Sequence, residues 1–182
     1  MKRKVFTSLA AAGILVCTIT TASARATPAC QHRFCLWQNP CCETQLPQKP
    51  EIPDEAPTGT MSALEQAACD LVNQQRIANG LNPLTIDSNL SIKARIKSQD
   101  MKTNRYFSHS SPTYGSPFQM MKQLGISYRS AGENIAMGYA TAQSVVNAWM
   151  VSESHRNNIL SGNYTTMGIG YVDGYWTQWF IR

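Results

Sequence analysis

Histidine is scarce in this chain of 182 residues, and common motifs of hydrolytic enzymes are absent. The three histidines are His32, His109 and His155. There is no G-x-S-x-G motif to place a serine nucleophile on a strand-to-helix turn. The stretch "HRNNIL", which starts at His155, lacks the spacing of a helical metalloprotease motif and has no third ligand close by. The sequence therefore offers no recognisable nucleophile.

The chain also lacks an apolar run long enough to span a membrane. A spanning helix needs about 20 apolar residues, whereas the longest run extends from Val5 to about Thr20. A basic start precedes this run, and small residues ending at Ala24 or Ala26 follow it, as in a secretory signal. We predict a signal peptide over residues 1–26 and no membrane span in the mature chain. A retained N-terminal anchor is the alternative.

Excess positive charge is nearly lost with the signal. The whole chain has 16 Lys and Arg against 11 Asp and Glu, and four of the basic residues lie in the signal: Lys2, Arg3, Lys4 and Arg25. A loose basic group around one predicted helix is expected to be a solvated surface: Lys93, Arg95, Lys97, Lys102 and Arg105. Because nucleic-acid binding needs a clustered basic face, we expect no nucleic-acid partner.

Cysteine is dense near the N-terminus and scarce elsewhere. Cys17 leaves with the signal, and Cys69 stands alone in the later part of the chain. The other four cysteines lie close together: Cys30, Cys35, Cys41 and Cys42. In an exported chain they predict two disulfides with three possible connectivities. The alternatives are a metal site that includes His32 and lipid modification of Cys30. The odd number of cysteines in the mature chain favours a disulfide-linked partner.

Composition divides the chain into four segments. The signal is followed by a Cys-rich N-terminal segment over residues 27–46 and by a Pro-rich linker over residues 47–60. The main part of the linker reads "PQKPEIPDEAPTG". A single domain is predicted over residues 61–182, which is long enough to bury one core.

Helix start signals recur along this domain. Four residues are predicted N-caps: Ser62, Asp87, Ser116 and Thr141. Glu65 completes a capping box with Ser62, and Pro117 occupies the first helical position after Ser116. Cys69 lies beside the apolar face of the first helix, so we expect a buried, unreactive thiol.

The end of the chain is β-prone. "TTMGIGYV" and "YWTQWFIR" flank Asp173-Gly174, a dipeptide that favours a type I′ hairpin turn. A further strand is expected between Ile126 and Met137, and the hairpin tryptophans are expected in the core. Helices first and an antiparallel hairpin last predict an α+β domain in which helices cover a small sheet.

Three residues of the domain are candidates for chemistry. His109 lies in a loop rich in Ser, Pro and Gly, Glu133 directly follows Gly132, and His155 follows the helix that contains Trp149. Two imidazoles and a carboxylate can bind Zn²⁺ or act as an acid and base pair. Separate structural roles are the alternative, including a His–Glu clasp that joins two loops.

Five segments in order, "YFSHSSP", "AGENIA", "HRNNIL", "GIGY" and "YWTQWF", resemble the CAP superfamily. This superfamily contains the cysteine-rich secretory proteins, the antigen 5 and pathogenesis-related proteins, and the bacterial SCP-like extracellular branch. The resemblance implies an α-β-α sandwich, secretion and a cleft around a His and Glu cluster.

Only half of that cluster is retained here. His109 matches the first cleft histidine and Glu133 the glutamate of the "GEN" motif, whereas Ser152 stands at the second glutamate and Tyr175 at the second histidine. His155, characteristic of the bacterial branch, is a candidate to replace the lost imidazole. Because two protein ligands are too few for a stable zinc site, zinc is an option only if His155 joins the other two.

The sequence thus predicts a secreted, bacterial SCP-like binding module of the cell envelope, without catalysis, whose ligand is apolar or envelope-associated. One alternative is an extracellular hydrolase, protease-like, with or without the assistance of zinc. The other is a cell-surface or spore protein cross-linked by disulfides.

Overall fold

The computed structural model of the chain describes residues 59–182. The predicted signal peptide, the Cys-rich segment with its four cysteines and nearly all of the linker lie outside the described residues. The described part contains, in order, α1 (Ala63–Ala78), β1 (Thr85–Ile86), α2 (Ser88–Thr103), α3 (Pro117–Gln123), β2 (Ala131–Met137), α4 (Ala142–Val151), α5 (Glu153–Ile159), β3 (Thr166–Val172) and β4 (Tyr175–Ile181).

The local start signals position the first four helices as predicted. Each of the four predicted N-cap side chains accepts a hydrogen bond from the backbone N–H three residues later: Ser62, Asp87, Ser116 and Thr141. These bonds satisfy amide groups that the helix itself cannot pair. Glu65 completes its capping box, since its carboxylate accepts from the backbone N–H of Ser62 at 2.7 Å.

The strands form one sheet in the order β1-β3-β4-β2. β3 and β4 make the predicted hairpin, and Asp173 and Gly174 at its turn have φ angles of 43° and 88°, as a type I′ turn requires. β2, the predicted further strand, is antiparallel to β4. One feature differs from expectation, because β1 runs parallel to β3. Two residues are too short a strand to leave an alternating pattern in the sequence.

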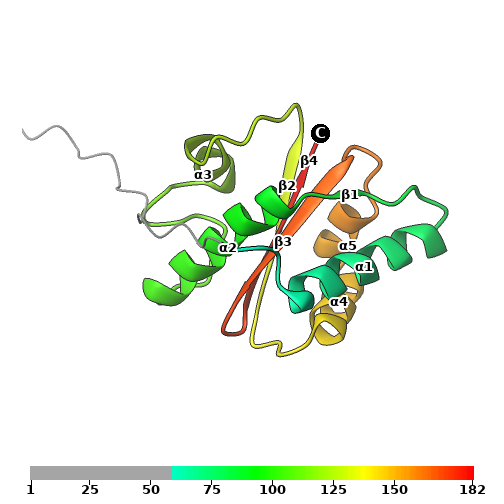
Figure 1. Cartoon of the computed structure of the whole chain (residues 1–182), viewed down its shortest axis with the longest axis horizontal. Helices are drawn as coiled ribbons and strands as arrows, with labels where there is room; N and C mark the ends of the chain where they lie inside the picture. The colour runs from blue at the N-terminus through cyan, green and yellow to red at the C-terminus, as the bar shows by residue number, and fades with distance from the viewer. Residues whose placement is uncertain (1–58) are drawn as a thin grey trace, which may run out of the picture. The chain divides into compact units, whose positions relative to one another are not determined.

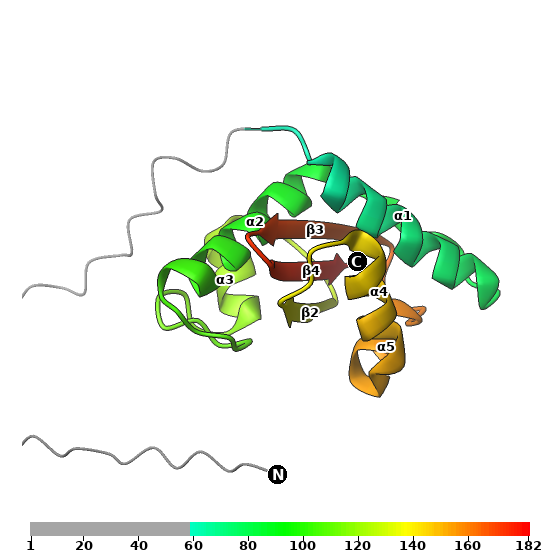
Figure 2. The same cartoon turned by 90° about the horizontal axis from the view of Figure 1, so that it is seen from below.

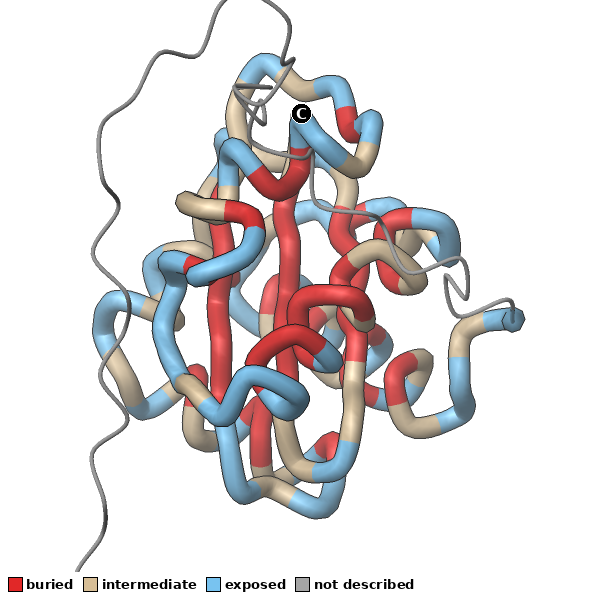
Figure 3. The backbone as a smooth tube through the Cα atoms, turned by 90° about the vertical axis from the view of Figure 1, so that its left-hand side faces the viewer, coloured by how far each residue is buried: buried red, intermediate tan, exposed pale blue. Residues whose placement is uncertain are grey.

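Helices cover both faces of the sheet, which makes an α-β-α sandwich (Figures 1 and 2). α2 and α3 lie on one face and pack with Trp179, whereas α1, α4 and α5 lie on the other and pack with Trp176 and Phe180. The strands are therefore buried along most of their length (Figure 3). The prediction that the hairpin tryptophans belong to the core is confirmed.

The glycines of "GIGY" allow α2 to lie against the backbone of β3. A Cβ atom on Gly168 would come within 2.5 Å of the backbone nitrogen of Ser91, and one on Gly170 within 2.1 Å of that of Arg95. Only glycine permits this approach. The contact fixes α2, and with it the start of the loop that contains His109.

Candidate functional site

The candidate site lies where the loop between α2 and α3 meets β2, an outer strand of the described sheet. His109 belongs to the loop and Glu133 to β2. The His109 Nδ1 atom lies 2.7 Å from Glu133 Oε1. Two residues that are 24 positions apart in the chain thus form a hydrogen-bonded pair.

The two members of this pair differ in exposure. The Glu133 side chain is 3% exposed and the His109 side chain 55%. The indole N–H of Trp179 donates to the second carboxylate oxygen, Oε2, at 2.7 Å. An ionised carboxylate only accepts hydrogen bonds, so Nδ1 of His109 carries a proton. In the neutral ring this leaves Nε2 as an acceptor on the exposed histidine.

A buried lysine fixes the His109 loop to α2. Lys97, on that helix, is 0% exposed. Its Nζ donates to the Tyr106 hydroxyl at 3.0 Å and to the carbonyl oxygens of Ser108 and His109 at 2.9 and 3.0 Å. Burial lowers the pKa of Lys97, while the negative charge of Glu133 acts in the opposite direction. The expectation that Lys97 belongs to a solvated basic surface is therefore wrong, because three acceptors of one loop replace its water.

Asp100, one turn further along α2, organises the rest of the loop. Its carboxylate accepts from the Ser111 hydroxyl at 2.7 Å, the Thr113 hydroxyl at 3.1 Å, the Asn104 amide at 2.7 Å and the Tyr106 hydroxyl. Burial, followed by the hydrogen bond to Asp100, raises the pKa of Tyr106, so this phenol stays a donor. α2 thus holds the loop at several points.

His155 lies on α5 and points its ring at a different partner. His155 Nδ1 is 2.7 Å from the Ser152 hydroxyl oxygen. Burial, followed by the charge of His109, lowers the pKa of His155. His155 therefore interacts electrostatically with His109. The described residues show no hydrogen bond between His155 and either His109 or Glu133.

Side-chain amides tie α5 to β2. Asn158 Nδ2 donates to Asn134 Oδ1 at 2.8 Å and to the backbone oxygen of Glu133 at 3.2 Å. Asn134 in turn donates to the His155 backbone oxygen at 3.2 Å and to Gln178 at 3.1 Å. The asparagines of "GEN" and "HRNN" therefore support the strand that carries Glu133.

Residues 69–180 match the CAP family model, described as the cysteine-rich secretory protein family. This match covers more than half of the chain.

The chain belongs to the CAP family.

Relatives in Bacillus subtilis strain 168 match most of the CAP domain. YkwD is 54% identical over 136 residues, which cover 74% of this chain and 52% of YkwD. The membrane protein YlbC is 37% identical over 131 residues, which cover 72% of this chain and 38% of YlbC. The chain therefore spans about half or less of these relatives. Within residues 59–182 no helix is long and apolar enough to cross a membrane.

Solved structures share the fold. An extracellular protein of Bacillus anthracis containing an SCP domain is 34% identical, with a TM-score of 0.64, over 69% of this chain and 45% of that one. An outer surface protein of Borrelia burgdorferi is 21% identical, with a TM-score of 0.60, over 68% of this chain and 97% of that one. The Borrelia likeness concerns the fold alone.

The side chains of this CAP domain do not fit the zinc site that the family resemblance implies. Glu133 is nearly buried and its oxygens accept from His109 and Trp179, whereas the Nδ1 atom of His155 faces Ser152 instead of this pair. Among residues 59–182, no three or more His, Cys, Asp or Glu side chains are grouped to hold a metal ion. Joint metal binding by His109, Glu133 and His155 stays a prediction that zinc calorimetry can test, and no chemical step is derived through it.

Sequence motifs identified His109, Glu133 and His155, but not the residues that position them. Trp179 pairs in register with Glu133 across β2 and β4, so the strand alignment was the missing information. The "HRNNIL" motif includes Asn158, whose partner is visible only when α5 is placed against β2. Nothing in the sequence marks Lys97 as buried.

Proposed function

We propose that this chain is a secreted CAP-domain protein of the cell envelope that binds an apolar or envelope-associated ligand at the His109–Glu133 site without turning it over. The location is supported by the similar extracellular SCP-domain protein of Bacillus anthracis. The ligand-binding role is supported by the geometry of the site.

The observation that carries the proposal is the burial of the Glu133 carboxylate together with its hydrogen bonds to His109 and Trp179. Because the Glu133 side chain is almost fully buried and each of its oxygens already accepts a hydrogen bond within the protein, the carboxylate is poorly placed to reach a proton of a substrate. Among the described residues, no hydroxyl or thiol side chain is hydrogen-bonded to the His109 ring. The Nε2 atom of the half-exposed His109 ring is left to accept a hydrogen bond from a ligand.

The surroundings of His109 support a partly apolar ligand. Phe107, two residues before His109 in the same loop, is 47% exposed. Exposed aromatic side chains next to a hydrogen-bonding group are common at binding sites.

Sedimentation with two probes tests this proposal: purified peptidoglycan sacculi and phosphatidylglycerol vesicles. The wild-type chain is expected to sediment with one of them, and His109→Ala or Phe107→Ser should weaken binding at least about fivefold. Lys122→Ala, an exposed change on α3, is the matched control and should bind normally. Sedimentation with neither probe, or equal binding by wild type and both site variants, would overturn the proposal.

A hydrolase is the second candidate because Ser152 and His155 form a hydrogen-bonded pair. The lowered pKa of His155 keeps its ring neutral near pH 7, as a general base requires. Turnover of a fluorogenic casein by wild type, abolished in Ser152→Ala with the fold intact, would favour this candidate over the binding module.

A cross-linked surface or spore protein is the third candidate. It depends on Cys30, Cys35, Cys41 and Cys42, which lie outside the described residues.

A further inference from the structure

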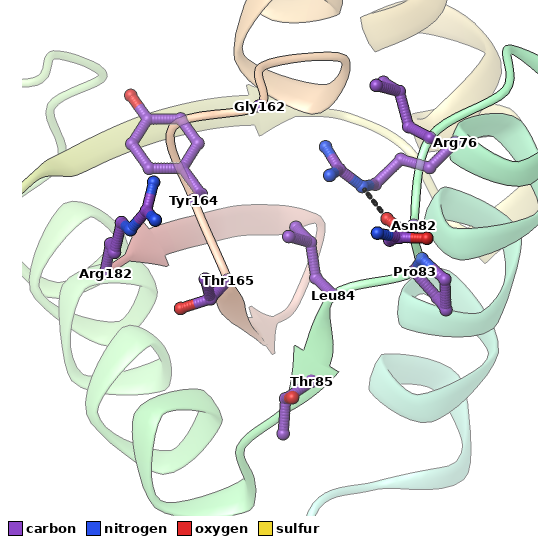
Figure 4. A pocket seen from close by; sticks show the side chains of 10 residues that line it. Arg76, Asn82, Pro83, Leu84, Thr85, Gly162, Tyr164, Thr165 and Arg182 are labelled. Atoms are coloured by element: carbon purple, nitrogen blue, oxygen red, sulfur yellow. Dashed lines mark hydrogen bonds between the residues drawn. The ribbon is translucent and has the colours of Figure 1, made fainter.

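A hollow of about 390 Å³ is lined by Arg76 near the end of α1, the segment 81–85, Gly162, Tyr164, Thr165 and Arg182 (Figure 4). It shares no lining residue with the His109–Glu133 site. Its volume is at the lower end of the range of small-molecule pockets, about 300–1,000 Å³. The lining includes two arginines, Arg76 and Arg182, and no acidic residue.

Arg76 is a buried cation whose partners are all neutral. The residue is 3% exposed. Its Nε donates to the Asn82 carbonyl oxygen at 2.9 Å, and its Nη1 donates to those of Ile159 and Ser161 at 2.6 and 2.8 Å. No carboxylate of residues 59–182 forms a salt bridge with it. A buried charge without a counter-charge is costly, and burial accordingly lowers the pKa of this guanidinium.

The third nitrogen of Arg76 is available. Nη2 has no hydrogen-bond partner in the described part of the chain, although every fully buried side-chain nitrogen and oxygen there has one. Nη2 must therefore be the part of the guanidinium that reaches the surface, where Arg76 lines the hollow. Figure 4 shows Arg76 and Arg182 on opposite sides of the hollow, with Leu84 and Thr165 between them.

We propose that this hollow binds a small organic carboxylate with an apolar body. The carboxylate would accept from Arg76 Nη2 and lie near the Arg182 charge, which gives the buried cation the counter-charge that the described protein lacks. Leu81, Pro83 and the Tyr164 ring provide contacts for the apolar body. Charge specifies the anion, while the apolar lining excludes strongly hydrated inorganic ions.

Amide chemical shifts of the secreted chain test the proposal with 3-phenylpropionate and its neutral isostere, 3-phenylpropionamide. The carboxylate should cause saturable shifts at residues 81–85 and 162–165, and it should bind at least about tenfold more tightly than the amide. Inorganic phosphate is the third probe and should bind more weakly than 3-phenylpropionate. Equal binding of carboxylate and amide, tighter binding of phosphate, or no saturable shift in these segments would overturn the proposal.

Variants must avoid the structural role of Arg76, because its removal leaves three carbonyl groups without a donor. Arg182 and Thr165 are exposed, so Arg182→Gln and Thr165→Tyr should fold normally. Arg182→Gln should weaken the binding of 3-phenylpropionate at least about threefold. Thr165→Tyr should fill the hollow and abolish binding. Arg105→Gln is the matched control on an exposed arginine outside the hollow and should bind as wild type does. Unchanged binding by both Arg182→Gln and Thr165→Tyr would overturn the assignment.

Discussion

At the scale of single residues, the carboxylate of Glu133 decides what His109 can do. It is buried and each of its oxygens accepts a hydrogen bond, so it fixes the His109 proton on Nδ1. In the neutral ring, the other nitrogen, Nε2, therefore offers a lone pair. A ligand donor is favoured there over a ligand acceptor.

Glu133→Gln should move that proton. An amide has only one oxygen, and the indole of Trp179 can only donate, so the amide oxygen should face Trp179 and its NH₂ group should face His109. His109 should then carry its proton on Nε2, which ¹⁵N shifts of the imidazole report. The free energy of unfolding in urea should fall by about 1–2 kcal/mol because charge-assisted bonds are lost. Glu153→Gln, on exposed α5, is the control; a proton that stays on Nδ1 would contradict this account.

His155 should make stability depend on pH. Its folded pKa is depressed below the ordinary value of 6.5, so the folded state binds this proton less readily than the unfolded state does. The contribution of neutral His155 to the free energy of unfolding is present above pH 6.5 and is lost as the pH falls through the folded pKa. Urea unfolding of wild type and His155→Gln at pH 7.5 and 5.0 should show a smaller loss in the variant. An equal loss would assign the pH dependence to other groups.

At the scale of elements, the close contact of α2 with β3 fixes both the core and the His109 loop. Gly170→Ala should lower the free energy of unfolding by more than about 3 kcal/mol, because the new Cβ would lie 2.1 Å from backbone that cannot yield locally. Gly162→Ala is the matched control, since no atom lies within 4 Å of its added Cβ. Thermal unfolding compares the Gly170→Ala and Gly162→Ala variants. Equal melting temperatures would show that α2 can move away from the sheet.

The features predicted from sequence are those that depend on near neighbours in the chain. An N-cap side chain accepts from the backbone N–H three residues later, and the Asp173-Gly174 turn depends only on the φ angles of its own two residues. Both features could therefore be predicted from the sequence. The burial of Lys97 and the pairing of Trp179 with Glu133 depend on how distant elements meet. The family resemblance supplied part of that information, since it paired His109 with Glu133. It did not supply the residues around the pair.

At the scale of the whole molecule, the cysteine count takes a different meaning once Cys69 is placed. The odd number of mature cysteines favoured cross-linking between chains. Cys69, however, is 0% exposed within the α1–α4 core, and burial, aided by the charges of Asp70 and Glu65, raises its pKa to about 12. Cys69 is thus unavailable for cross-linking, and if the predicted signal peptide removes Cys17, the cysteines available for disulfides number four, which is even.

Cys69 should therefore be inert in the folded chain and irrelevant to any cross-linking. At pH 8 a thiol of this pKa is ionised only to about one part in ten thousand, so a thiol reagent should modify Cys69 only after unfolding in urea. On non-reducing gels, Cys69→Ser should give the same pattern as wild type. If that pattern is a ladder that collapses with reductant, Cys42→Ser should alter it, and the cross-linked surface protein gains support; a clean monomer counts against it. A ladder lost in Cys69→Ser would contradict the burial of this thiol, because only an accessible Cys69 could join two chains.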